Sequence, residues 1–227
     1  MLRKVIITLS FSLMFTSVTT VVKAEWIKDQ QNKWVYYEND SSKLNYNMTE
    51  NYIEPMKLPQ YYQADDRWGA KRYGLSNMKL TGCVPTALAM AISGLKEDVN
   101  PVQVADFLYS MTMELNTTFL GTSSLGVQEV VSQWGLNYKV IDSKEELEKT
   151  LKNGTLVYGA VGHGIFVNGY STHAVLLTGY ENGKTKAFDP DNMAKTNKWY
   201  NIDDIWKERS LAPEDNMTGG AFIAIYK

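Results

Sequence analysis

The segment that most constrains the fold is a run of small and apolar residues, "VPTALAMAI" at 84–92, which follows the only cysteine of the chain, Cys83. Ala, Leu and Met favour helix, and Pro85 suits a first helical turn, where its missing N–H would be unpaired anyway. The run predicts a helix over residues 84–94 with Cys83 at or just before its N-terminus. A lone cysteine forms no disulfide within the chain, so Cys83 is a buried small side chain, an intermolecular link or a reactive thiol.

The N-terminus has the pattern of a secretory signal peptide. Arg3 and Lys4 supply positive charge, an apolar run follows at 5–22, and a small-x-small cleavage site ends at Ala24. The alternative is a membrane anchor, but Ser and Thr dilute the run, which is at the short end of the ~20 residues that span a bilayer. We expect removal of residues 1–24 and a mature protein that is secreted or held at the cell surface, without membrane association after cleavage.

Export bears directly on the cysteine. In an oxidising compartment a stable protein usually has paired cysteines or none, so a single thiol suggests a chemical role. The partial positive charge at a helix N-terminus stabilises a thiolate, and the free backbone N–H groups there can hold an oxyanion. Gly82 would let a substrate backbone come close to the thiol. These features predict that Cys83 is a nucleophile rather than a buried core residue.

A thiolate nucleophile needs a base, and the chain has two histidines, His163 and His173. His163 lies between glycines in "AVGHGIF", which indicates a loop that at most lines a cleft. His173 opens "HAVLLTGYE", an alternating apolar stretch that predicts a strand. An Asn182-Gly183 turn joins it to a second strand, so the two strands should form a β-hairpin. We therefore expect His173 to be the base.

The register of this hairpin decides whether Asp189 can orient the imidazole. A turn centred on Asn182 places Asp189 opposite Val175, on the same face as His173. A two-residue turn would shift the register by one and direct Asp189 to the other face. The spacing permits the His173–Asp189 pair and leaves the choice between these registers open.

Two glutamines upstream of the cysteine, Gln60 and Gln63 in "LPQYYQADDRW", are candidates for a side-chain donor to an oxyanion. Such a donor must lie near the nucleophile, and surface exposure is the usual environment of a glutamine. Spacing alone prefers neither residue.

Four motifs together resemble the papain-like cysteine peptidases of family 39, and in particular the exported bacterial branch related to the peptidases that remove double-glycine bacteriocin leaders. The motifs are "YYQADDRWG", "TGCVPTALAM", "THAVLLTGY" and "FDP", in that order, and the resemblance covers residues 58–227. It implies that Cys83 is the nucleophile, His173 the general base and Asp189 the residue that orients the base. It also implies that Gln63 is the oxyanion-hole glutamine.

The remaining pattern fits an α+β, papain-like fold in which N-terminal helices pack on an antiparallel sheet, with the active site in the cleft between them. Ser143 and Glu146 predict a capping box at the start of the last of these helices. We expect helices at 84–94, 101–110, 124–134 and 144–152, and strands at 137–141, 155–161, 172–180, 184–189 and 221–226.

The residues between the signal peptide and the catalytic domain differ in composition. Residues 25–57 are rich in Trp, Tyr and Asn, and poor in Ala and Leu. "NKWVYYEND" resembles one aromatic unit of a cell-wall-binding repeat, but one unit cannot bury its own face. We therefore expect residues 25–57 to form an extended strand or pro-like arm, and residues 58–227 to form the peptidase domain.

Several other chemistries are excluded. A formal net charge of −2 without a Lys/Arg cluster gives no reason to expect nucleic acid. One cysteine and two scattered histidines do not supply the three or four ligands of a zinc site. Adjacent carboxylates such as Asp65 and Asp66 face apart on a strand or helix, so they indicate surface charge. With no phosphate loop or dinucleotide fingerprint either, we expect neither a metal nor a cofactor.

The sequence thus predicts an exported cysteine hydrolase that cleaves a peptide or amide bond. Two alternatives remain: an acyl transferase of the transpeptidase type with the same triad, and a non-catalytic cell-surface binding module, against which the complete set of catalytic residue types argues. The expected substrate is a peptide, a protein such as a bacteriocin precursor, or the peptide part of peptidoglycan, and association with the cell wall is a further expectation.

Overall fold

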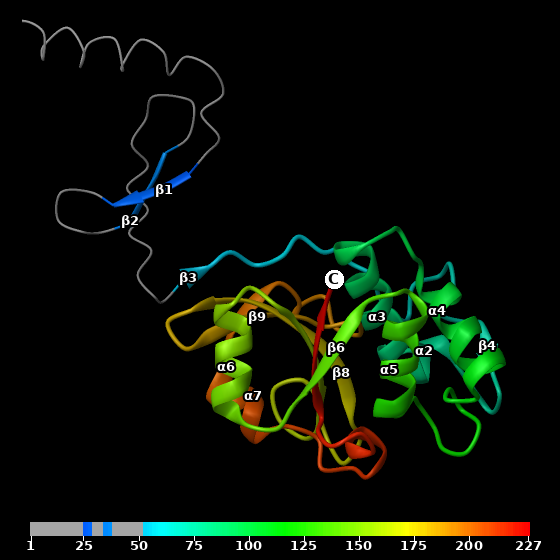
Figure 1. Cartoon of the computed structure of the whole chain (residues 1–227). Coiled ribbons are helices and arrows are strands. Elements are labelled where there is room, and N and C mark those ends of the chain that lie inside the picture. Colours follow the sequence, from blue (N-terminus) through cyan, green and yellow to red (C-terminus); the bar gives the residue numbers. More distant parts are fainter. Residues whose placement is uncertain (1–24, 29–33, 38–51) are drawn as a thin grey trace, which may run out of the picture. The chain divides into compact units, whose positions relative to one another are not determined.

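The computed structural model describes residues 25–28, 34–37 and 52–227 (Figure 1). Contacts divide the chain into two compact units, Met1–Thr49 and Glu50–Lys227. In the first unit, β1 (Glu25–Lys28) pairs antiparallel with β2 (Trp34–Tyr37). The predicted signal peptide lies outside the described residues, and no helix within the described ranges is long and apolar enough to cross a membrane.

The second unit contains six α-helices in the described chain, which alternate in the sequence with groups of strands. They are α2 (Met78–Thr81), α3 (Cys83–Leu95), α4 (Pro101–Phe107), α5 (Ser124–Gln133), α6 (Lys144–Lys152) and α7 (Ile202–Lys207). A π-helical turn, Leu108–Thr112, continues α4, and a 3-10 turn, Glu214–Asn216, precedes the last strand.

A seven-stranded antiparallel sheet forms the centre of this unit. Its order is β10-β9-β8-β7-β11-β6, and β3 pairs with the C-terminal end of β8. The bounds are β3 (Tyr52–Ile53), β6 (Asn137–Ile141), β7 (Leu156–Val161), β8 (His173–Glu181), β9 (Lys184–Phe188), β10 (Lys198–Asn201) and β11 (Phe222–Tyr226). A separate two-stranded sheet joins β4 (Arg72–Tyr73) to β5 (Ser76–Asn77).

The sheet separates two hydrophobic cores. Figure 1 shows α3, α4 and α5 on one side of the sheet and α6 and α7 on the other. On one face Leu176 and Phe188 pack with α3, α4 and α5. On the other face Leu177 and Ala187 pack with α6 and α7. Because neighbouring residues of a strand point to opposite faces, β8 and β9 contribute to both cores. The expected α+β architecture, with helices packed on an antiparallel sheet, is confirmed.

Helix α3 forms where the apolar run predicted a helix, and it begins at Cys83. Every residue from 84 to 92 is buried, so this helix has no solvent-facing side along that stretch. Gly94 allows the Leu58 side chain to pack closely against α3, because a Cβ at residue 94 would lie 2.3 Å from Leu58 Cδ2. A helix that is apolar all round is stable only when other elements cover it completely.

The start of α6 has half of the predicted capping box. Ser143 Oγ accepts a hydrogen bond from Glu146 N at 3.3 Å. The Glu146 carboxylate accepts from Asp142 N at 3.4 Å instead of from the N-cap nitrogen. Leu147 and Leu151 are buried, and the lysines and glutamates lie on the outer side, which makes α6 an amphipathic helix.

Short elements were missed by the sequence patterns. The strand β10 and the helix α7 lie in "KWYNIDDIWK", a segment with four charged residues in which six residues of helix are too few to show a helical period. The helix predicted at 101–110 ends its regular part at Phe107, and the chain continues as a π-helical turn. Thr112 Oγ1 donates to Leu108 O at 2.8 Å in this turn.

The second unit begins before the predicted boundary at residue 58. Tyr52 and Ile53 pair with Glu181 and Tyr180 of β8. Met56 N donates to Thr178 Oγ1 at 2.9 Å. The last part of the predicted arm is therefore bound to the sheet through the backbone.

The β8–β9 hairpin resolves the open question of register. Its turn is the two-residue Asn182-Gly183 turn, with positive φ at both residues and Glu181 paired with Lys184. Leu176 nevertheless pairs with Phe188, which is the register of the other alternative. A β-bulge between Thr178 and Glu181, at Gly179 with φ +73°, corrects the one-residue shift.

Candidate active site

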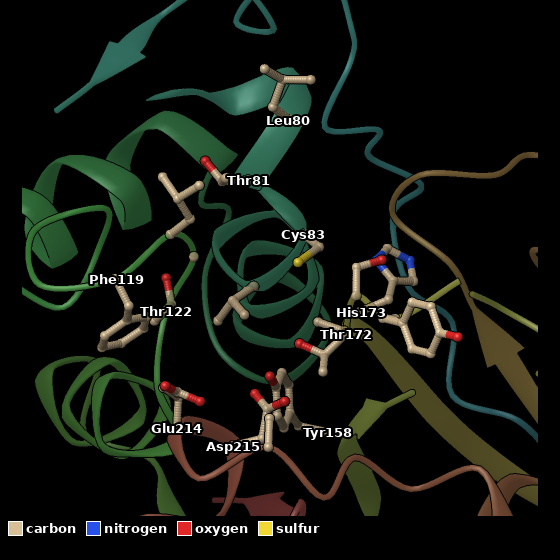
Figure 2. Close-up of a pocket in the computed structure, with 17 residues that line it drawn as sticks. Leu80, Thr81, Cys83, Phe119, Thr122, Tyr158, Thr172, His173, Glu214 and Asp215 are labelled. Carbon is tan, nitrogen blue, oxygen red and sulfur yellow. The ribbon is translucent and has the colours of Figure 1, made fainter. Parts of the chain in front are cut away.

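Three ends of regular elements meet at the candidate site. Cys83 is the first residue of α3, His173 is the first residue of β8, and Asp189 directly follows β9. Figure 2 shows Cys83 and His173 as neighbours, and a hydrogen bond between the two side chains contributes to the raised pKa of His173. The structure thus brings the predicted nucleophile, base and orienting carboxylate together.

The position of Cys83 leaves its backbone N–H outside the helical hydrogen bonds. The first of these runs from Thr86 N to Gly82 O at 3.0 Å. The structure gives a steric reason for glycine at position 82, because a Cβ there would lie 2.3 Å from Met78 O. The tight connection between α2 and α3 therefore requires glycine at this position.

His173 is held between the carboxylate and the thiol. Its Nε2 lies 2.8 Å from Asp189 Oδ1, which leaves Nδ1 for Cys83. The side chain is 11% exposed, and this burial lowers its pKa, but the hydrogen bonds with Asp189 and Cys83 outweigh burial and raise the pKa of His173 to about 10. The imidazole is therefore protonated at neutral pH.

Asp189 is fixed by the turn that follows it. Its Oδ1 accepts three hydrogen bonds, from His173 Nε2, from Asp191 N at 2.8 Å and from Asn192 N at 3.1 Å. Thr196 Oγ1 binds both backbone groups of Asp189, at 2.7 Å to N and 2.9 Å to O. The side chain is 1% exposed, so the carboxylate is held in place beside the imidazole.

Gln63 lies between the loop after β9 and the helix before the cysteine. Its backbone N donates to Pro190 O at 2.8 Å, and its Nε2 donates to Lys79 O at 2.8 Å. The residue is 5% exposed, and Oε1 has no hydrogen-bond partner within residues 52–227. One Nε2 hydrogen remains available. Gln60, by contrast, is exposed and accepts only from Tyr62 on the surface.

His163 is bound to its own loop. Its Nδ1 accepts from Gly169 N at 3.3 Å, and the side chain is exposed. It is not among the residues that line the cavity beside Cys83. Its environment fits the loop histidine that the flanking glycines indicated.

A cavity of about 460 Å³ opens beside the thiol. Sequence reasoning did not find its other polar residues, because they come from separate elements with no common motif. These polar residues include Thr122, Tyr158, Thr172, Glu214 and Asp215. In Figure 2 Thr172, Tyr158, Glu214 and Asp215 lie below Cys83, and Thr122 lies to its left.

No group of three or more His, Cys, Asp or Glu in the described part of the chain could hold a metal ion. The site presents a thiol, an imidazolium and a carboxylate. These groups, with backbone and amide donors nearby, suit acyl transfer through a thioester.

Comparison with solved structures gives similar folds at low sequence identity. A C39-like peptidase from Bacillus anthracis matches at 16% identity and a TM-score of 0.53, over 78% of this chain and 98% of that chain. The peptidase domain of Streptococcus ComA, a bifunctional ABC transporter, matches at 19% identity and a TM-score of 0.48, over 75% of this chain and 96% of that chain. No curated protein sequence matches the chain.

The sequence itself matches a family model. The model is described as "Peptidase_C39 like family" and aligns with residues 55–217, which include Gln63, Cys83, His173 and Asp189. The match spans well over half of the chain and agrees with the fold similarity to the Bacillus protein. The chain therefore belongs to the C39-like peptidase family and is a cysteine peptidase with the papain-like fold of that family.

Proposed function

We propose that the protein is an exported cysteine peptidase that hydrolyses a peptide or amide bond with Cys83 as nucleophile, His173 as base and Asp189 as the orienting carboxylate. The observation that carries the proposal is the placement of His173, which is hydrogen-bonded to Cys83 and, at 2.8 Å, to a buried carboxylate. A surface histidine near a buried structural cysteine would have neither the fixed carboxylate nor the raised pKa.

The reaction has two halves. Cys83 Sγ attacks the substrate carbonyl carbon, and the thiol proton resides on His173 Nδ1. His173 then gives this proton to the nitrogen of the leaving amine as the C–N bond breaks, which leaves an acyl thioester on Cys83. Water attacks the thioester while His173 accepts its proton, and the released thiolate and the carboxylic acid product complete the cycle.

The oxyanion of each tetrahedral intermediate needs two donors. The backbone N–H of Cys83 and the second Nε2 hydrogen of Gln63 supply them in this proposal. The bond from Gln63 Nε2 to Lys79 O fixes the amide from one side and so directs its other hydrogen. Because the amide is already oriented, it does not have to reorganise during the reaction.

Secretion and a cell-surface location rest on the N-terminal sequence alone. Removal of residues 1–24 would give a mature chain that acts on extracellular peptides, proteins or peptidoglycan peptides. Association with the cell wall would concentrate the enzyme on the last of these substrates. Peptide substrates are the class that membership of a peptidase family supports.

The test uses the mature chain with a peptide library and with peptidoglycan fragments, read by mass spectrometry. Cleavage should depend on Cys83, so Cys83→Ala should retain the fold and lose turnover. Cleavage by this variant would overturn the proposal. Addition of an amine such as glycinamide separates hydrolysis from acyl transfer, because a transferase would form the amide product instead of the acid.

Iodoacetamide gives a second readout that needs no substrate. A thiolate beside an imidazolium should be alkylated fast at neutral pH, whereas a buried inert thiol should react slowly. Slow alkylation together with no cleavage would support a non-catalytic binding module instead.

A further inference from the structure

The cavity beside Cys83 has an apolar rim. Leu80, Leu120 and Tyr170 line it, and their exposed fractions are 70%, 68% and 108%. Large apolar side chains so exposed around a cavity mark a surface that a ligand covers. The rim offers contact to the carbon chain of a substrate residue.

The far end of the cavity is acidic. Glu214 and Asp215 both line it, and Figure 2 shows Asp215 beside Tyr158, with Glu214 on the other side of Asp215. Asp215 is 7% exposed, and its partners are hydroxyl groups, Ser210 Oγ at 2.5 Å and the side chain of Thr172. Within residues 52–227 neither carboxylate has an ion-pair partner, so this end carries uncompensated negative charge.

A hydroxyl group in the wall is also without a partner. Thr122 is 5% exposed, and its Oγ1 is buried with no hydrogen-bond partner in the described chain. Its methyl carbon lies toward Gly126, where a Cβ would come within 2.8 Å. A buried polar atom without a partner is costly, so a polar group entering this cavity would gain a hydrogen bond.

Tyr158 connects the two ends of the cavity. Its side chain is 2% exposed, and burial and the charges of Asp215 and Cys83 raise its pKa. It therefore lies within electrostatic range of both the nucleophile and the acidic end. A side chain of the substrate residue next to the attacked bond can extend along Tyr158 to these carboxylates.

We propose that this cavity is a specificity pocket that binds a cationic side chain of the substrate, lysine or arginine, near the bond that Cys83 attacks. The inference rests on the proposed function of the same site. Lysine and arginine carry an apolar stem and a charged head, which match the apolar rim and the acidic end. Burial and the neighbouring Glu214 raise the pKa of Asp215, and a bound cation would oppose this rise by favouring the charged carboxylate.

Selection against other residues follows from the same charges. A neutral side chain would bring no positive charge to the two neighbouring carboxylates, and an acidic one would add a third negative charge. The pocket should therefore distinguish charge more strongly than length.

Paired peptides test this inference. In a cleaved peptide, each residue within three positions of the cleaved bond is replaced in turn by arginine or its neutral isostere citrulline, and by lysine or norleucine. At one position the cationic member should have the higher kcat/KM by about 10- to 100-fold, the value of a hydrogen bond to a charged group. Equal rates for both members at every position would overturn the inference and leave the proposed function intact.

Variants assign the preference to the two carboxylates. Glu214→Gln and Asp215→Asn should each reduce the arginine-to-citrulline ratio, whereas Glu145→Gln, an exposed glutamate on α6, should keep it. Asp215 also fixes its loop through Ser210, so Glu214→Gln decides the outcome if Asp215→Asn does not fold. An unchanged ratio in Glu214→Gln would overturn the assignment.

Labelling of the thiol separates this inference from the proposed function. Cys83 is the only cysteine, so its reaction with trimethylammonioethyl and sulfonatoethyl methanethiosulfonate can be followed by intact mass. After normalisation to a free thiol, the cationic reagent should react faster, and Glu214→Gln should reduce this advantage. Charge-selective labelling without cleavage of any peptide would refute the proposed hydrolase and uphold a cation-binding pocket. Labelling without charge selectivity would refute the pocket.

Discussion

Replacement of Asp189 by asparagine should lower the pKa of His173 by about one to two units. The substitution keeps an oxygen that can accept from His173, Asp191 and Asn192, but it removes the negative charge 2.8 Å from the imidazolium. A hydrogen bond to a charged partner contributes about 1.5–3 kcal/mol, and one pKa unit corresponds to about 1.4 kcal/mol. From a value of about 10, the pKa should therefore fall to about 8–9.

Nuclear magnetic resonance can measure this shift directly. The chain has two histidines, so a protein without an affinity tag and labelled at histidine Cε1 gives two signals, and His163→Gln assigns them. Cys83→Ala is the matched variant, because it removes the other partner that raises the pKa. A pKa of His173 that stays near 10 in Asp189→Asn but drops in Cys83→Ala would refute the view that the carboxylate raises this pKa.

The same shift has a consequence for stability. His173 has a folded-state pKa above its ordinary value of 6.5, so its pairing stabilises the fold fully below pH 6.5 and loses this contribution as the pH rises through about 10. The parent should therefore have a higher free energy of unfolding than Asp189→Asn, and the difference should be largest near pH 6.5 and smaller toward pH 10. A difference that does not shrink toward pH 10 would contradict the linkage.

Gln63→Ala removes one oxyanion donor, so turnover should fall about 10²–10³-fold while iodoacetamide alkylates Cys83 at nearly the parent rate; Gln60→Ala is the control, and an equal loss of alkylation would mean that Gln63 positions the thiol. His173→Ala should cut kcat by about 10⁴-fold or more and His163→Ala far less, and the reverse ranking would make His163 the base. In the parent enzyme kcat/KM should decline as the pH rises through about 10, because His173 must carry a proton to protonate the leaving amine, and a profile flat to higher pH would exclude this role. Gly179→Ala should destabilise the protein by at least about 1–3 kcal/mol in urea unfolding, because φ is +73° and a Cβ would lie 2.8 Å from Pro55 Cα; an unchanged midpoint would mean that the bulge relaxes easily.

The helix that carries Cys83 and the hairpin that carries His173 were predictable because each has a strong local signal. An apolar run after a single cysteine specifies a buried helix, and an Asn-Gly turn between alternating apolar segments specifies a hairpin. That Cys83 and His173 lie next to each other depends on tertiary packing, and in the sequence only the order of the four motifs indicated it.

The exact register at Asp189 was beyond the sequence because two irregularities cancel. The two-residue turn alone would have directed the carboxylate to the wrong face, and the bulge at Gly179 turns it back. A glycine inside a strand pattern indicates a bulge or a close approach, but not which of them. Here it serves both, since Pro55 and Ile53 lie against it.

The cavity could not be predicted for a different reason. Thr122, Tyr158 and Asp215 come from a loop, a buried strand and a 3-10 turn, and each reads locally as an ordinary residue of its element. Only tertiary packing places them around the thiol. Specificity in such a domain is therefore less visible in sequence than the nucleophile is.

The pairing of β3 with β8 has a practical consequence for recombinant fragments of the protein. A fragment that starts at residue 58 would lack the two β3 pairs and the bond from Met56 N to Thr178 Oγ1, and it would leave the edge beside Gly179 open to water and to other chains. A fragment that starts at Glu50 keeps this edge covered. The smallest soluble and active piece of the chain should accordingly begin before Tyr52, in what composition alone assigns to the arm.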